Sequence, residues 1–284
     1  MDILLIHVVN GISFGALLFI ISSGFTLALG MMQIVNIAHG GLYLLGAYIA
    51  WTVWGATGSF ILTIVVSVLP PMIVGIITQK WLLRKFYLQP LPQMLLTMGI
   101  ALIISEMGVI LWGGYPRVMA QPPSLAGATR LGSFTFPTYR LFIIAAGAGV
   151  ALFLWGLLEK TRVGAYVRAC VDDEEMARSM GVNVPRLFTF MFGFTCLLAG
   201  LGGAIGAAFL GAYQGAEFDI LFLSLVVVVL GGLGSLRGAL IASLFIGILD
   251  SLGKGYYPEL AHFTLSAPML IVLAVKPTGL LGKA

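Results

Sequence analysis

The sequence predicts an all-α integral membrane protein, a polytopic bundle of about 8–10 transmembrane or half-membrane helices with broken glycine-rich segments. Three observations lead to this prediction. Of the 284 residues, 60% are hydrophobic and only 9% are charged, whereas a soluble chain carries roughly 25% charged residues. Long stretches, such as 61–78 and 142–158, contain no charge at all. Their apolar residues also cover every face, instead of alternating with polar residues as in a membrane β-barrel.

Apolar runs bounded by charged or turn residues define nine candidate membrane segments within one transmembrane domain, residues 1–284. We expect them near residues 3–30, 36–55, 58–79, 94–113, 141–158, 187–213, 220–236, 239–253 and 263–276. The first is expected to be retained, because Asp2 stands where a secretory signal would carry positive charge. The last three are short for a hydrocarbon core about 30 Å thick, so some are expected to be half-helices or re-entrant segments.

The distribution of Lys and Arg predicts how the bundle is oriented in the lipid bilayer, because these residues favour the cytoplasmic side. With the N-terminus outside, nine crossings and a cytoplasmic C-terminus, ten basic residues lie inside and four outside. The inner set is Lys80, Arg84, Lys85, Lys160, Arg162, Arg168, Arg178, Arg186, Lys276 and Lys283; the outer set is Arg117, Arg130, Arg140 and Lys254; Arg237 is unassigned. The net charge of +4 then reflects topology and does not indicate nucleic-acid binding.

Two hydrophilic loops are longer than turns. The extracytoplasmic loop, 114–140, is rich in Pro, Gly and Ser and predicts an irregular or partly extended cap. The cytoplasmic loop, 159–186, predicts two short helices, the second starting at the acidic DDEE run and ending at Gly181. Its mixed charges suit docking of another protein, although a solvated connector would have the same composition. The candidate docking residues are Asp172, Asp173, Glu174, Glu175, Met176, Ala177, Arg178 and Gly181.

Two glycine-rich stretches, NIAHGG at 36–41 and LGGLGSLRGA at 230–239, interrupt apolar runs. Unwound backbone at membrane depth survives only where it is buried in protein or lines a water-filled path, so we expect both beside a translocation path, at related points of two halves. Acidic residues inside apolar runs indicate such a path too. A structural interpretation is also open, in which the acids pair with Arg237 or Lys254 and the Asn and His are buried hydrogen-bonding residues. The candidate path residues are Asn36, His39, Gly40, Glu106, Gly232, Ser235 and Asp250.

No catalytic or metal site is predicted. Cys170 and Cys196 are too few and too differently placed for a disulfide framework or a metal site, and no partner near His39 has metal spacing. The nearest match to a phosphate-binding loop, GILDSLGKG at 247–255, has one residue too many before Gly-Lys and lacks the following Ser or Thr. We therefore expect no cofactor on this chain, and any ATP and Mg²⁺ must be bound by another chain.

Several of these stretches together resemble the permease subunits of branched-chain amino-acid ABC importers, the Liv type, within a wider group that includes sugar and urea permeases. ISEMGVILWGG, which contains Glu106, resembles the family's fourth-span region, and RVGAYVRACVDDEEMARSMGVNVPRL resembles its cytoplasmic coupling loop. GGLGSLRGALIAS and KPTGLLGK also match, and the likeness covers nearly the whole chain. At Gly41 the chain departs from many relatives, which carry an acidic residue there. The amino-terminal signature is carried by Asn36, Ala38, His39, Gly40, Leu45, Gly46, Ala47 and Tyr48.

The resemblance implies a permease subunit that works by alternating access in an ATP-driven importer, for branched-chain or other hydrophobic amino acids. It implies a second homologous permease, two cytoplasmic ATP-binding subunits and an extracytoplasmic substrate-binding protein, in a bacterial or archaeal cytoplasmic (inner) membrane. The acidic helix at 172–181 is then the expected ATPase contact. Two alternatives stay open: a permease for urea, amides or small carboxylates, and an ion-coupled secondary transporter that uses Glu106 and Asp250. A channel is disfavoured, because no repeated filter motif occurs.

Overall fold

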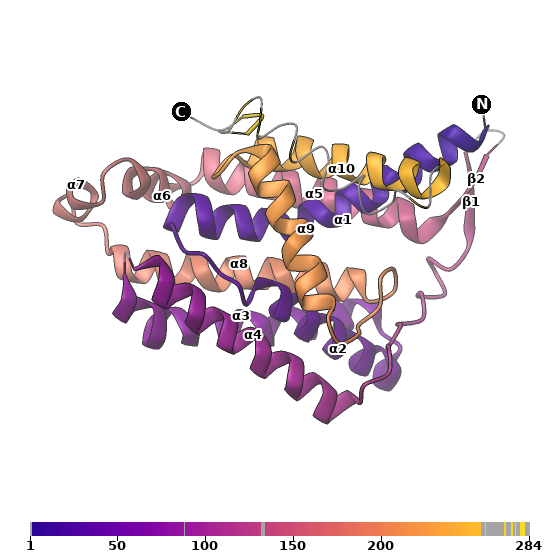
Figure 1. The fold of residues 1–284 in the computed structure, drawn as a ribbon, viewed down its shortest axis with the longest axis horizontal. Helices are drawn as coiled ribbons and strands as arrows, with labels where there is room; N and C mark the ends of the chain where they lie inside the picture. Colours follow the sequence, from indigo (N-terminus) through magenta and orange to yellow (C-terminus); the bar gives the residue numbers. More distant parts are fainter. Residues whose placement is uncertain are drawn as a thin grey trace.

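The computed structural model describes residues 2–87, 89–131, 134–256, 259, 270, 274, 276 and 279–281. Over these residues the chain forms ten α-helices and a small β-hairpin (Figure 1). The helices are α1 (Asp2–Met32), α2 (His39–Thr57), α3 (Phe60–Ile77), α4 (Pro90–Trp112), α5 (Thr138–Lys160), α6 (Arg162–Asp172), α7 (Glu174–Ser179), α8 (Val184–Gly206), α9 (Ala216–Gly231) and α10 (Leu236–Tyr256). The strands are β1 (Ala128–Leu131) and β2 (Phe134–Pro137), and a π-helical turn (Thr78–Leu82) and a 3₁₀ turn (Leu83–Phe86) prolong α3.

The predicted helical membrane bundle is confirmed. Within the described residues, six helices are long and apolar enough to cross a membrane: α1, α3 with its prolonging turns, α4, α5, α8 and α10. Helix α9 has 16 residues, which makes it about 24 Å long at 1.5 Å per residue, shorter than a hydrocarbon core of about 30 Å. It is therefore too short to cross the hydrocarbon core completely. The ninth expected segment, 263–276, lies almost wholly outside the described residues.

Helix α8 ends at Gly206, earlier than the expected segment 187–213. The chain leaves the helix because the following residues pair with the loop after α4. The backbone N–H of Arg117 donates to the Ala212 carbonyl at 2.8 Å, and the Ala212 N–H donates to the Arg117 carbonyl at 2.7 Å. Gly211, at φ +78°, supplies the left-handed backbone that the turn requires. Later in the same loop, β1 and β2 pair as an antiparallel hairpin with Ala128 opposite Pro137.

Close helix packing explains much of the glycine content. A Cβ at Gly11 would lie 2.5 Å from the Ile248 Cα, and one at Gly15 would lie 2.7 Å from the Ser243 carbonyl oxygen, so α1 and α10 touch through backbone. On α8, a Cβ at Gly202 would lie 2.4 Å from a side-chain carbon of Ile21. Small residues spaced four apart let membrane helices approach in this way. Close contacts between helices therefore account for these three glycines.

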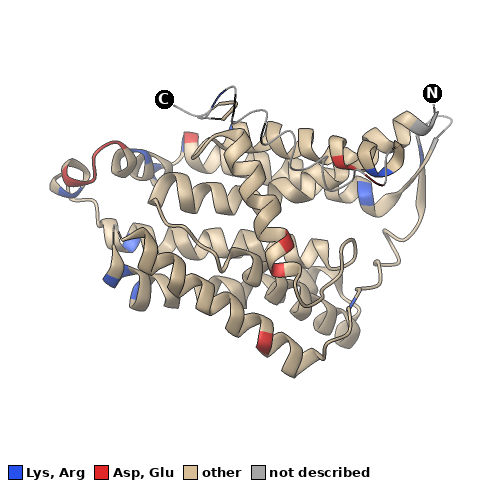
Figure 2. Cartoon of the chain, in the orientation of Figure 1, with Lys and Arg blue, Asp and Glu red and all other residues tan. Residues whose placement is uncertain are grey.

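The helices differ in how much apolar surface they expose. Helix α8 is largely buried, and so is the C-terminal half of α1, whereas α3, α4 and α5 present exposed apolar side chains such as Ile61, Ile103 and Leu152. In Figure 1, α6 and α7 project at one end of the bundle and the β-hairpin lies at the other; we call these the α6–α7 end and the hairpin end. Lys and Arg gather at the two ends, and most of the bundle between them carries no charge (Figure 2).

Candidate functional site

The loop between α5 and α8 folds as two capped helices. Thr161 begins α6, where its hydroxyl oxygen accepts a hydrogen bond from the Gly164 N–H at 3.3 Å. Asp173 begins α7 in the same way, accepting from the Met176 N–H at 2.9 Å. These are the side chains that favour the first position before a helix, because their oxygens satisfy otherwise unpaired N–H groups. Gly181, at φ +89°, closes the end of α7. The predicted pair of short helices is therefore confirmed.

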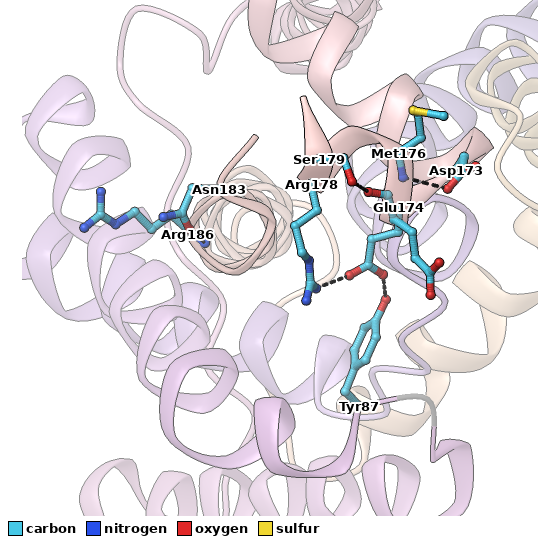
Figure 3. Close-up of polar contacts among 9 residues, drawn as sticks. Tyr87, Asp173, Glu174, Met176, Arg178, Ser179, Asn183 and Arg186 are labelled. Carbon is cyan, nitrogen blue, oxygen red and sulfur yellow. Dashed lines mark hydrogen bonds and ion pairs between the residues drawn. The ribbon is translucent and has the colours of Figure 1, made fainter. Parts of the chain in front are cut away.

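Glu174 connects α7 to a second segment of the chain (Figure 3). Its carboxylate accepts a hydrogen bond from the guanidinium of Arg178, one turn later, at 2.5 Å. Its other oxygen accepts from the hydroxyl of Tyr87, which lies between the prolonged end of α3 and α4. Burial, together with this bond to a carboxylate, raises the pKa of the Tyr87 phenol to about 12. A displacement of α7 would thus be transmitted to the junction of α3 and α4.

The two faces of α6 and α7 differ in character. The inner face buries Val167, Cys170 and Ala177 in an apolar cluster that includes Phe188 of α8 and Leu83. The outer face exposes large apolar side chains, most strongly Met180, which is 79% exposed, with charged neighbours between them. Exposed methionines are common on docking surfaces, and the docking role of this face stays a prediction. We call this outer face, formed by Tyr166, Val171, Asp172, Glu175, Met176, Arg178 and Met180, the α6–α7 surface.

The NIAHGG stretch ends the connection between α1 and α2 with residues 36–38 and forms the first turn of α2 with residues 39–41. It is largely buried, and the Ile37 N–H donates to Thr97 Oγ1 of α4 at 3.1 Å. His39 Nε2 donates to the Ile21 carbonyl at 2.9 Å, while Nδ1 has no hydrogen-bond partner among the described residues. Neither polar atom of the buried Asn36 amide has one. Unpartnered buried polar atoms are uncommon in folded proteins, and the path role of Asn36, His39 and Gly40 stays a prediction.

Glu106 and Asp250 occupy different surroundings. Glu106 is exposed on α4 among exposed apolar side chains, and it makes no hydrogen bond or ion pair with the described residues. Asp250 is buried in α10, and its Oδ2 accepts a hydrogen bond from Lys254 Nζ at 2.7 Å. The structural interpretation of Asp250, pairing with Lys254, is therefore observed, whereas Glu106 has neither of its expected basic partners. Asp250 also lines a cavity of about 530 Å³.

Gly232 and Ser235 lie in the turn between α9 and α10, at the α6–α7 end. Ser235 Oγ accepts from the Gly238 N–H at 3.0 Å, which caps the start of α10. Two residues later, Arg237 Nη2 lies 3.9 Å from Oε1 of Glu159 at the end of α5. This glycine-rich stretch is thus a turn with Leu233 and Gly234 exposed. It contacts the last turn of α1, where a Cβ at Gly30 would lie 1.9 Å from the Gly234 Cα.

Sequence reasoning missed Glu217, a buried acid in the first turn of α9. It is only 3% exposed, and its carboxylate accepts from Ser105 Oγ at 2.6 Å and from the Gly215 N–H at 2.9 Å. Its carbonyl oxygen lies against Gly40, where a Cβ would approach to 1.8 Å. The expected segment 220–236 started three residues too late to include this acid. Among the described residues no group of three His, Cys, Asp or Glu side chains could hold a metal ion.

Comparison with known proteins adds the family. A sequence profile for the "Branched-chain amino acid transport system / permease component" family matches residues 7–273. The chain is 26% identical to the high-affinity branched-chain amino acid transport system permease protein LivH of Escherichia coli K12, over 96% of this chain and 94% of LivH. It is also 26% identical to the corresponding protein BraD of Pseudomonas aeruginosa PAO1, over 98% of this chain and 95% of BraD.

A solved structure described as PsaBC from Streptococcus pneumoniae in complex with Fab is similar in fold. It matches with a TM-score of 0.57 at 14% identity, over 98% of this chain and 93% of that chain. At this identity the likeness concerns the fold alone. The family match spans most of the chain, in agreement with the signature at 36–48 and the α6–α7 loop. This chain therefore belongs to the branched-chain amino acid permease family, as a multi-pass membrane component of an ABC transporter that is not itself catalytic.

Proposed function

We propose that this chain carries branched-chain or other hydrophobic amino acids across the membrane as the permease subunit of an ATP-driven importer. Family membership supports this proposal, because curated members of similar length are named as branched-chain amino acid permeases. The observation that carries the mechanism is the α6–α7 surface, where exposed methionines and mixed charges stand on two capped helices that pack on α8. Such a projection suits the groove of a cytoplasmic ATPase, whose closure would move it as a rigid body.

The proposed complex contains a second homologous permease, two ATP-binding subunits and an extracytoplasmic binding protein. ATP and Mg²⁺ belong to the ATPase subunits in this proposal. The α6–α7 end is proposed to face the cytoplasm, because the chain's basic residues divide ten to four in favour of that side when the N-terminus is outside. The carboxylate of Glu106 is exposed on α4, and a charge directed at lipid is costly. This favours packing of the second permease against α4.

The test combines a mild-detergent pull-down of the tagged chain with substrate-stimulated ATP hydrolysis by the recovered complex. We expect two ATPase chains and a second permease. Simultaneous Glu174→Lys and Glu175→Lys substitution should abolish substrate-stimulated hydrolysis while the chain still reaches the membrane, because it reverses a charge of the α6–α7 surface at Glu175 and breaks the bonds of Glu174 to Arg178 and Tyr87. Arg130→Glu on the exposed β-hairpin is the matched charge-reversal control and should keep full stimulation.

A backbone variant tests the same surface without changing its charge. Proline cannot adopt the φ of +89° at Gly181, so Gly181→Pro should abolish stimulation. Gly58→Pro is its control, because Gly58 also has positive φ, at +62°, but ends α2 and has open space around it. Normal stimulation in both the charge-reversed and the Gly181→Pro chains would contradict the coupling role. Recovery of the chain alone, under conditions that preserve a control complex, would contradict the importer.

Uptake of radiolabelled L-leucine into cells tests the cargo. We expect uptake to stop when ATP is depleted and to continue when the proton gradient is collapsed at constant ATP. A proton-coupled carrier would stop when the gradient is collapsed and would not need ATP directly. Excess urea, short amides or small carboxylates should compete poorly with leucine. Strong competition by one of these compounds would assign the cargo to that class and leave the ATP-driven mechanism standing.

A further inference from the structure

A cavity of about 530 Å³ lies between α1, α2, α5, α9, α10 and the segment that follows α8, and Tyr43 of α2 is among its lining residues. Its volume falls in the range of roughly 300–1,000 Å³ typical of small-molecule pockets. It is lined from the N-terminal parts of α1 and α5 and the C-terminal part of α10, which places it toward the hairpin end, opposite α6 and α7 (Figure 1). We propose that this cavity binds one amino acid, a zwitterion with an apolar side chain, within a single permease subunit; the assignment rests on the proposed function.

Asp250 supplies the negative end of the proposed site. Only 4% of the residue is exposed, and its Oδ2 is engaged by Lys254 Nζ. Its Oδ1 is buried without a hydrogen-bond partner among the described residues. A buried carboxylate oxygen without a donor is costly, and an ammonium group is the donor that matches its charge. The α-ammonium of an amino acid would therefore be held at Asp250 Oδ1.

Arg140 supplies the positive end. It enters the cavity lining from the first turn of α5, and its guanidinium carbon lies 5.5 Å from the centre of the Phe209 ring. Over the described residues it makes no hydrogen bond or ion pair, so its five donors are available. A guanidinium on an aromatic face presents its edge to a carboxylate, which it can bind through two parallel hydrogen bonds. The second cation, Lys254, is already paired with Asp250.

The rest of the lining includes the polar His7, Asn10 and Ser251, and its apolar part suits an uncharged, apolar side chain. Phe14, Leu210, Ile220 and Leu223 supply apolar surface. The second acid in the lining, Asp219, is exposed, and its Oδ2 accepts a hydrogen bond from the Tyr213 hydroxyl at 2.8 Å. By contrast, the hydroxyl of the buried Tyr43 has no partner among the described residues and can donate to a bound carboxylate. The buried acceptor at Asp250 Oδ1, the Arg140 guanidinium and the apolar part of the lining together match an amino acid such as leucine.

The test is direct binding of radiolabelled L-leucine to the purified full-length transporter, with two single-charge analogues as competitors. Isocaproate lacks the ammonium group of leucine, and isopentylamine lacks the carboxylate. We expect Asp250→Asn and Arg140→Gln each to weaken leucine binding by at least about tenfold, the loss typical of one hydrogen bond to a charged group. Asp250→Asn should raise competition by isocaproate relative to leucine, and Arg140→Gln should raise competition by isopentylamine.

A change in the relative affinity for leucine and its two analogues shows that the substituted side chain contacts the ligand. A variant that merely loosens the bundle would weaken all three compounds alike. Glu159→Gln, at the other end of α5, and Arg130→Gln, on the β-hairpin, are the matched controls and should bind leucine as the unaltered chain does. If either cavity variant fails to assemble, Tyr43→Phe removes a single hydroxyl at constant packing and should still weaken binding several-fold.

Two results would overturn the proposed site. One is absence of leucine binding to the unaltered transporter at millimolar ligand. The other is unchanged affinity and analogue preference in Asp250→Asn, Arg140→Gln and Tyr43→Phe. Neither result touches the proposed function, which is judged separately by ATP-dependent uptake in cells and by the subunits recovered with the chain.

Discussion

The carboxylate of Glu217 accepts a hydrogen bond from the hydroxyl of Ser105 at 2.6 Å, across 112 residues of sequence. This bond joins the first turn of α9 to the buried face of α4. The second carboxylate oxygen of Glu217 accepts a hydrogen bond from the Gly215 N–H. The Ser105 hydroxyl and the Gly215 N–H are therefore both satisfied by this one side chain. A buried charge is stabilised by such bonds and becomes costly once a partner is removed.

Ser105→Ala should therefore lower the free energy of unfolding by about 1–3 kcal/mol, because it removes a donor from a buried carboxylate. Thermal unfolding can be followed by alkylation of the two buried thiols, Cys170 and Cys196, which react as the fold opens. The control is Ser124→Ala, at an exposed serine that makes no hydrogen bond with the described residues. An unchanged unfolding temperature for Ser105→Ala would show that the bond does not hold α4 to α9.

Gly40→Ala should prevent normal packing of α2 on α9, since its Cβ would lie 1.8 Å from the Glu217 carbonyl oxygen. We expect a large fall in monodisperse protein after detergent extraction. Gly99→Ala in α4 is the matched control, because no atom of the described residues outside its own helix backbone and chain neighbours lies within 4 Å of its added Cβ. Alanine there should leave stability unchanged or raise it by up to about 1 kcal/mol through helix propensity. Equal behaviour of the two variants would contradict the close approach.

Tyr87→Phe should weaken the response of ATP hydrolysis to substrate by several-fold, since it removes the hydrogen bond between α7 and the α3–α4 junction. Assembly with the ATPase should persist, because the exposed residues of the α6–α7 surface are unchanged. Tyr115→Phe, at an exposed tyrosine in the loop after α4, is the control. Loss of assembly together with stimulation would mean that Tyr87 shapes the α6–α7 surface and does not transmit its movement.

The Tyr87 bond also predicts a pH range. Its pKa is raised from 10.0 to about 12 in the folded chain, so its contribution to stability is fully present below pH 10 and is lost as the pH rises through 12. The difference in unfolding temperature between the unaltered chain and Tyr87→Phe should thus stay constant from pH 6 to 9, within the range set by these values. A difference that varied strongly between pH 6 and 9 would point to another titrating group.

Much of the fold follows from local composition. Uncharged runs such as 61–78 can satisfy their backbone in a bilayer only as helices, so the spans were predictable to within several residues. Capping chemistry is also local, and Asp173, the acidic first turn of α7 and Gly181 predicted a helix that the structure shows. The signature at 36–48 carried the family resemblance, which the family match confirms.

Other features depend on which helices meet. The LGGLGSLRGA stretch forms a turn at the α6–α7 end, whereas the similar NIAHGG break is largely buried beside α4, and composition does not distinguish these positions. Glu106 and Asp250 were similar as acids within apolar runs, yet only Asp250 faces a cavity and a lysine. The Tyr87–Glu174 and Ser105–Glu217 bonds join residues 87 and 112 positions apart.

By itself, the sequence determined that this chain is a helical membrane protein, where its spans lie, how its docking helices are capped and which family it resembles. These properties depend on hydropathy, charge and capping over a few turns, which act between near neighbours. The tertiary structure alone decided which polar groups are buried, which remain unpartnered and which enclose the cavity between α1, α5, α9 and α10. Those properties depend on contacts between distant helices, where burial raises the cost of every unpaired charge or hydrogen-bonding group.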